Sequence, residues 1–127
     1  MTDSHIALSV PALPSFARSV RMMAANLAVL CPMSVEEVED ARMAAEEAFV
    51  YVCATKPGTC NIDFCVSSDA LSMSFSLGSH NAADDPKLAE QIGLAELLLS
   101  AVSDSYEVAS DGTSLCVTKL AGGANGH

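Results

Sequence analysis

The first part of the chain changes its hydrophobic period from two residues to three or four. Ile6, Leu8 and Val10 alternate with small or polar residues, which predicts a strand that ends at Pro11. Apolar residues then recur at helical spacing, and this helix should end before Pro32 because a proline disfavours the α conformation of the preceding residue. The apolar positions of this helix are Phe16, Val20, Met23, Leu27 and Leu30.

A capping sequence predicts the start of a second helix. Ser34 can accept a hydrogen bond from the first free amides while Glu37 reaches back, as in an S-x-x-E capping box. The carboxylates at positions 36, 37, 39 and 40 suit the positive end of the helix dipole. We expect the helix to stop at the sequence Lys56-Pro57-Gly58. Its many alanines indicate close packing against another layer.

The second half of the chain alternates with period two. Residues 60–66 and 71–77 are joined by a turn at 67–69 and predict a hairpin with one buried and one polar face. A polar, helix-breaking stretch at 78–86 precedes a helical segment at 88–102.

A second hairpin follows, formed by residues 106–109 and 114–119 around a turn at 110–112. Two hairpins cannot make an alternating parallel sheet. We therefore expect an α+β two-layer sandwich, with a mixed, largely antiparallel sheet and all helices on one face.

The length of 127 residues fits one domain, and half of the residues are hydrophobic, which excludes a disordered chain. We expect a single domain over residues 1–127, ordered from about 5 to 120. The glycine-rich tail at 122–127 is expected to fray.

Charge excludes nucleic acid as a direct partner. The formal net charge is −10, from 6 basic and 16 acidic residues, so a phosphate backbone would be repelled. A protein partner with a basic surface is compatible with this charge. The N-terminus shows no signal peptide and no apolar run reaches the roughly 18 residues that span a membrane, so we expect a cytoplasmic protein without membrane contact.

The five cysteines do not predict a metal site. No C-x-x-C pair is present, the closest spacing being that of Cys60 and Cys65, and the three histidines lie far away in sequence. A catalytic cysteine lacks a histidine placed by any motif. We expect reduced, buried thiols that act as small hydrophobic groups.

Several short motifs together resemble one bacterial family. The sequence P-S-F-A-R at 14–18, E-D-A-R-M-A-A-E-E-A at 39–48, Y-E-V at 106–108 and V-T-K at 117–119 are similar to segments of the anti-sigma-factor serine kinases of partner switching. The predicted order of elements also matches from residue 6 to residue 120. This family belongs to the histidine-kinase-like ATPase superfamily, whose fold is called the Bergerat fold. The resemblance implies that fold, ATP and magnesium as cofactors, and a homodimer.

The resemblance also implies that much of the ATP site is missing. Glu47 matches the family's general base, but the asparagine that holds magnesium four residues later is Tyr51, whose phenol cannot replace a short carbonyl ligand. In the adenine-binding box the aspartate position is Leu77, and only Gly78 is kept. The final Gly-x-Gly before a helix is reduced to Gly93.

The assignments of Glu47 and Gly93 to an ATP site each have a purely structural alternative. The carboxylate of Glu47 could be a solvated helix side chain beside Glu46, and Gly93 an ordinary glycine at a helix entry. Alternatively, Asp84 or Asp85 could read the adenine, although both come late in the chain.

Arg18 matches a family arginine that contacts the sigma factor and the antagonist protein. Arg21 lies one turn further on the same helix face. The alternative is a surface arginine whose stem covers apolar helix. The Phe16, Met23 and Leu27 stripe should be core, with part of it available to a dimer.

The resemblance therefore implies a partner-switching regulator that binds a sigma factor or its antagonist without efficient kinase activity and without a cofactor. Two alternatives stay open: an active serine kinase that uses ATP and magnesium in an altered pocket, and an ATP-independent scaffold that has left sigma regulation.

Overall fold

A computed structural model describes residues 3–122 of the chain. Its elements follow in the predicted order: β1 (Ser4–Pro11), η1 (Pro14–Phe16), α1 (Ala17–Ala28), α2 (Val35–Thr55), β2 (Thr59–Val66), β3 (Ala70–Ser76), η2 (Ala82–Asp84), α3 (Pro86–Val102), β4 (Ser105–Val108) and β5 (Ser114–Leu120). The predicted fraying of the tail concerns residues that, from 123 onward, lie outside the described part.

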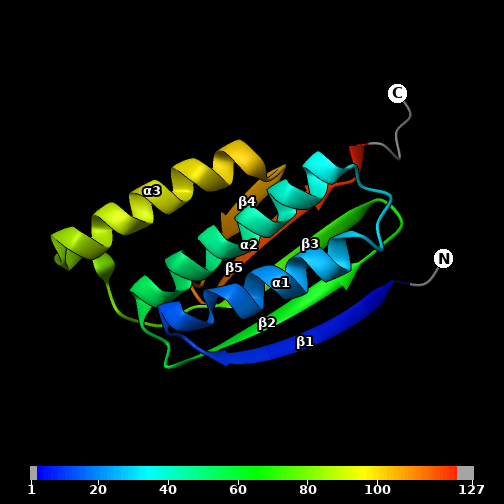
Figure 1. The fold of residues 1–127 in the computed structure, drawn as a ribbon. Helices are drawn as coiled ribbons and strands as arrows, with labels where there is room; N and C mark the ends of the chain where they lie inside the picture. The colour runs from blue at the N-terminus through cyan, green and yellow to red at the C-terminus, as the bar shows by residue number, and fades with distance from the viewer. Residues whose placement is uncertain (1–2, 123–127) are drawn as a thin grey trace.

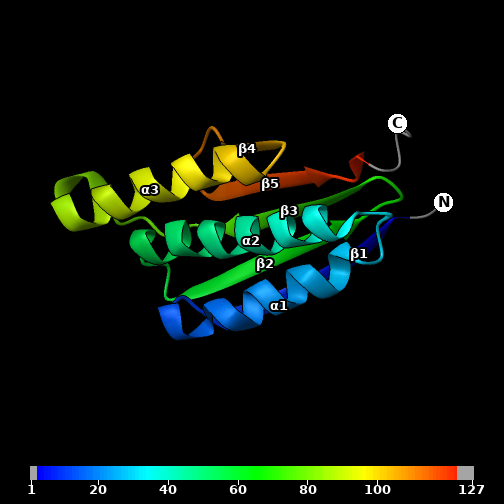
Figure 2. The same ribbon diagram turned by 45° about the horizontal axis from the view of Figure 1, so that its top comes forward.

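The sheet has the strand order β1-β2-β3-β5-β4, and three helices lie together on one of its faces (Figures 1 and 2). The α+β two-layer arrangement with helices on one face is confirmed. The predicted mixed character of the sheet is wrong, because every neighbouring pair of strands is antiparallel.

The connections explain why no neighbouring strands are parallel. α1 and α2 carry the chain out and back over the sheet, so β2 starts beside the end of β1 and runs against it. The single helix α3 returns the chain so that β4 has the same direction as β3. β5 then inserts between those two strands and is antiparallel to both.

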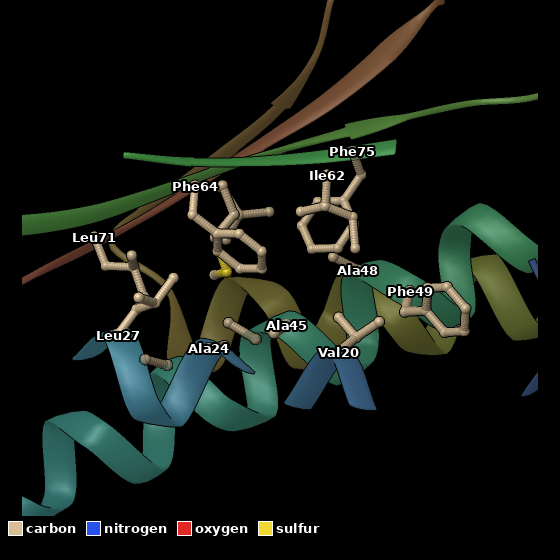
Figure 3. Packing of buried hydrophobic residues seen from close by; sticks show 14 of the residues in the cluster. Val20, Ala24, Leu27, Ala45, Ala48, Phe49, Ile62, Phe64, Leu71 and Phe75 are labelled. Carbon is tan, nitrogen blue, oxygen red and sulfur yellow. The ribbon is translucent and has the colours of Figure 1, made fainter. Parts of the chain in front are cut away.

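Alternation along the strands builds the core. The inward residues of β2 and β3 are buried, as predicted: Cys60, Ile62, Phe64, Val66, Leu71, Met73 and Phe75. In Figure 3 the side chains of Ile62, Phe64 and Phe75 point from the sheet toward the helix layer, where Ala45 and Ala48 of α2 lie. Both alanines are fully buried, so their small side chains let α2 pack closely on the sheet.

The predicted capping box at the start of α2 is confirmed. The backbone amide of Glu37 donates to Ser34 Oγ at 3.1 Å, and the amide of Ser34 donates to Glu37 Oε1 at 2.8 Å. At the other end Lys56 closes the helix in the left-handed region with φ 51°. The helix therefore begins and ends where its sequence signals place it.

α1 is shorter than its apolar pattern suggests. Val20 and Leu27 are buried, Phe16 and Met23 are half-buried against the core, and Leu30 is 67% exposed beyond the end of the helix. The stripe predicted as core is thus only partly in the core.

α3 is apolar around most of its circumference, yet only Ala95 and Leu99 are buried. Leu94 and Leu97 are 57% and 65% exposed. Within residues 3–122, none of the helices combines the length and the hydrophobicity that crossing a membrane requires.

All five cysteines are free thiols. Cys31 and Cys60 are buried, as predicted, whereas Cys116 is exposed. The prediction of a buried thiol is wrong at Cys116 because Leu115 and Val117 take the inward positions of β5, which leaves position 116 on the sheet face that carries no helices.

Candidate functional site

A cavity of about 360 Å³ lies beside the C-terminal half of α2. Its walls come from α2, from the loop and short helix after β3, from the first half of α3, and from the β4–β5 hairpin. The lining residues are Tyr51, Thr55, Leu77, Gly78, His80, Asn81, Ala82, Ala83, Ala89, Ile92, Val108 and Gly112. The structure therefore brings together three predicted site residues that are up to 27 positions apart in the sequence.

Gly78 is packed directly against the end of α2. A Cβ atom added there would overlap the carbonyl oxygen of Thr55 and lie 2.6 Å from backbone atoms of Lys56 and Pro57. The amide of Gly78 donates to Thr55 Oγ1 at 2.8 Å, and that hydroxyl donates to the carbonyl of Val52 at 2.7 Å. Only glycine fits this approach, so the loop after β3 is fixed to α2 at the floor of the cavity.

Further backbone bonds hold the cavity walls. The amide of His80 donates to the carbonyl of Thr55 at 3.1 Å, and the amide of Leu77 donates to the carbonyl of Thr113 at 2.9 Å. Asn81 Oδ1 accepts from the amide of Ala83 at 3.1 Å and so caps η2. The Asn81 side chain thus has a structural task within its own loop.

The two alternative aspartates do not line the cavity. Asp85 caps α3, since its Oδ1 accepts from the amides of Lys87 at 3.0 Å and Leu88 at 3.4 Å. Asp84 is exposed in η2. Neither is placed to read a base inside the cavity.

Among the described residues, the ionisable side chains of the cavity lining are those of Tyr51 and His80. Among the described residues that form its wall there is no Asp, Glu, Lys or Arg. Burial raises the pKa of Tyr51, and the nearby Glu96 carboxylate and Tyr106 phenol raise it further. The Tyr51 phenol is therefore neutral at physiological pH and supplies no charge to a bound group.

These residues do not fit ATP with magnesium. A magnesium ion requires oxygen ligands in octahedral geometry, usually including carboxylates, and the wall offers no carboxylate. A triphosphate requires cations or free helix amides, and the one helix that starts at the wall has its first amides taken by Asp85. Within residues 3–122, no three His, Cys, Asp or Glu side chains form a group that could hold a metal ion.

Glu47 lies one turn before Tyr51 on α2 but is not part of the cavity wall. Burial raises the pKa of Glu47, and the neighbouring Glu46 carboxylate raises it further. The carboxylate is half-buried. Glu47 therefore shows no partner that would mark it as a catalytic base of this cavity.

Gly93 is placed differently from its prediction. It is neither a phosphate loop nor a helix entry, because it lies well inside α3 and does not line the cavity. A Cβ atom added at Gly93 would meet nothing within 4 Å. Its backbone amide belongs to the helix interior and is not offered to a ligand.

The two arginines of α1 form a separate region. Arg18 is exposed and, within residues 3–122, makes no hydrogen bond or ion pair. Arg21 is used internally, since its Nη1 lies 3.0 Å from Glu46 Oε1 and ties α1 to α2. The two predicted partner-binding residues therefore have different environments.

An apolar groove of about 220 Å³ is lined in part by Ala17, the residue before Arg18. It lies where the start of α1 meets the second half of α2 and the first half of α3, and it is lined by Pro14, Ala17, Phe49, Val50, Cys53 and Gln91. Ala17 precedes Arg18 in the chain, and Pro14 lies one turn before it. Arg18 itself is not one of the lining residues.

Nine of the twelve lining residues are not among the residues predicted from the sequence, and the polar ones among these nine are Thr55, His80 and Asn81. A threonine directly before the helix stop at 56–58 is the one available signal, because threonines are uncommon in helix interiors. His80 and Asn81 lie in a polar loop whose composition gives no indication of a cavity.

No protein-family model matches this chain, and no curated protein matches it.

Proposed function

We propose that this protein is a cytoplasmic partner-switching regulator of the anti-sigma-factor type, which binds a sigma factor or its antagonist and does not depend on ATP. The observation that carries the proposal is Arg18, an exposed cation without an ion pair within residues 3–122, which follows Ala17, a lining residue of the apolar groove. The order of elements and the helix layer on one sheet face agree with the Bergerat fold that the resemblance implies.

An arginine beside an apolar pocket suits protein recognition. Arginine is enriched among the residues that dominate binding energy at interfaces, and such residues cluster around well-packed pockets. A partner that fits this region carries an apolar side chain for the groove and a carboxylate one or two residues away for Arg18. The guanidinium can hold that carboxylate with two parallel hydrogen bonds.

The cavity chemistry supports independence from ATP. Phosphoryl transfer depends on positioning and on neutralising charge around bound metal ions. The cavity wall holds no carboxylate, lysine or arginine, Tyr51 at the position of the family's magnesium ligand is neutral, and Leu77 stands at the position of its aspartate. We therefore assign regulation to protein binding and not to phosphorylation.

The test is capture of purified sigma factors and candidate antagonists from the source bacterium. We expect one of them to bind, and Arg18→Glu to weaken that complex by roughly tenfold or more, since truncating or reversing an interface charge commonly costs above about 1 kcal/mol. Lys87→Glu is the matched control, because Lys87 is also exposed and makes no ion pair within residues 3–122 but lies on α3. Equal binding by Arg18→Glu and the unchanged protein would remove Arg18 from the interface, and binding by neither class of partner would contradict the proposed function.

A further inference from the structure

We infer that this protein binds a long-chain monocarboxylic acid, a fatty acid, in a groove bounded by α1, α2 and α3. The groove joins the 220 Å³ hollow described above to a second hollow of about 500 Å³, because Pro14, Cys53 and Gln91 line both. We call the two together the acyl groove, with a smaller part and a larger part. The inference goes beyond the proposed function and needs no protein partner.

The wall of the acyl groove is mostly apolar. The start of α1 and the first half of α3 lie on either side of the C-terminal half of α2, as Figure 2 shows, and the loop after β1 adds a further wall. Small-molecule sites in proteins commonly have such a wall, with a few polar groups, in a volume of about 300–1,000 Å³. Besides the three shared residues, the smaller part is lined by Ala17, Phe49 and Val50, and the larger part by Ala12, Leu13, Lys56, Gly58 and Leu88.

One cation of the wall selects an anionic ligand. Lys56 is the single charged lining residue, and among residues 3–122 no Asp or Glu lines either part. Lys56 makes no ion pair within those residues, whereas Arg21, Arg42 and Lys119 each do. In a chain with 16 acidic and 6 basic residues, a lysine that no carboxylate neutralises is available to hold a carboxylate of a ligand.

The lack of free backbone donors favours an acyl chain over a peptide. Pro14 has no N–H group, and the amide of Ala12 already donates to the carbonyl of Gly58 at 2.9 Å. A peptide in the groove would lose water from its own amides and find, besides Lys56, only Gln91 as a hydrogen-bonding side chain. An acyl chain has no such groups to satisfy, so its burial costs no hydrogen bond.

The lining residues of α2 give the ligand a direction. Lys56 follows the end of α2 and lines only the larger part, whereas Phe49 and Val50 line only the smaller part. Cys53 lies between them in the chain and lines both parts. The carboxylate therefore lies in the larger part beside Lys56, and the chain passes Cys53 and ends in the smaller part.

Titration calorimetry on the full chain tests this with octanoate, decanoate and dodecanoate, each below its micelle-forming concentration. We expect one saturable site per chain, with an affinity that rises about threefold for each further buried methylene. Lys56→Gln should weaken dodecanoate binding about threefold. Lys87→Gln is the matched control and should leave it unchanged, since Lys87 is also exposed and without an ion pair in residues 3–122 but does not line the groove.

A second pair of variants tests where the chain ends. Val50 is half-buried on the wall of the smaller part, so Val50→Phe should fill that part with its ring. We expect this variant to bind octanoate and dodecanoate about equally, whereas Val50→Ala keeps the preference for the longer chain. Thermal unfolding shows that both variants are folded. A Val50→Phe protein that is folded and keeps the full preference for dodecanoate would overturn the inference.

The thiol of Cys53 reports occupancy directly. Saturating dodecanoate should slow alkylation of Cys53 severalfold and leave that of the exposed Cys116 unchanged, as read by mass spectrometry of peptides. The absence of saturable dodecanoate binding would overturn the inference. So would equal weakening by the two lysine variants, or an unchanged alkylation rate of Cys53 at saturation. A bound acid and a partner's side chain would compete for the smaller part, but none of these readouts involves a partner, so they fail or succeed independently of the proposed function.

Discussion

The amide of Gly78 donates a 2.8 Å hydrogen bond to the side-chain hydroxyl of Thr55, across 23 positions of the sequence. Thr55 is buried and ends α2, while Gly78 is half-buried in the loop that follows β3. This contact fixes the floor of the cavity to the helix that carries Tyr51. It explains why position 78 requires a glycine, since a Cβ atom there would overlap the backbone of residues 55–57.

Substitution at Gly78 should therefore be severe. We expect Gly78→Ala to lower the free energy of unfolding by roughly 3 kcal/mol, because the new methyl group meets the backbone of residues 55–57, which cannot move aside cheaply. Thr55→Val should cost about 1–3 kcal/mol, since it leaves the Gly78 amide without its acceptor. Urea denaturation measures both. A loss below about 1 kcal/mol for Gly78→Ala would show that the loop does not pack this closely.

Gly93 should behave in the opposite way. It lies inside α3 with open space around its Cα, so Gly93→Ala should raise the free energy of unfolding by about 0.5–1 kcal/mol through helix propensity alone. The same denaturation series measures this. A destabilised Gly93→Ala protein would mean that something packs on this turn of α3.

Glu47 gives a pH dependence with a defined sign. Its pKa is raised above 4.5 by burial and by the Glu46 carboxylate, so the folded state holds this proton more tightly than the unfolded state. Its contribution to stability therefore falls as the pH rises from 4.5 through the folded pKa. We expect Glu47→Gln to stabilise the protein at pH 7 by a few tenths of a kcal/mol, a small amount because solvent screens a half-exposed group.

Thermal unfolding at several pH values compares this variant with the unchanged protein. The stabilisation should disappear at pH values well below 4.5, where both proteins are neutral at this position. Glu46→Gln is the control and should destabilise, because it removes the partner of Arg21. A Glu47→Gln variant that is less stable at pH 7 would contradict the assigned environment.

Thiol labelling should separate the cysteines by burial. Cys116 is exposed on the open sheet face, whereas burial raises the pKa of Cys60 to about 11 and keeps its thiol protonated. We expect maleimide to modify Cys116 within the folded protein and Cys60 only after unfolding, as read by mass spectrometry of peptides. Equal labelling rates for the two cysteines in the folded state would refute the placement of β2 in the core.

Most helices and strands are predictable from the sequence because the interactions that form them join residues only a few positions apart. The capping box of Ser34 and Glu37 fixes the start of α2, and the alternation at 60–66 and 71–77 fixes which faces of β2 and β3 are buried. The cavity itself is only partly predictable. Tyr51, Leu77 and Gly78 follow from the resemblance, and the structure places all three around one cavity.

Long-range pairing explains what the sequence does not reveal. The insertion of β5 between β3 and β4 makes the sheet wholly antiparallel, and no local pattern encodes that choice. The same holds for the use of Arg21, whose ion pair with Glu46 joins residues 25 positions apart. Gly93 misleads for another reason: a glycine at a loop and a glycine inside a helix look identical in a sequence.

The affinity for a sigma factor or antagonist, measured by titration calorimetry with and without ATP and magnesium, tests the central claim most directly. We predict the same dissociation constant under both conditions, no magnesium-dependent heat from ATP alone, and a complex weakened about tenfold or more by Arg18→Glu. Magnesium-dependent ATP binding at micromolar concentrations, or a partner affinity that requires ATP, would contradict the account.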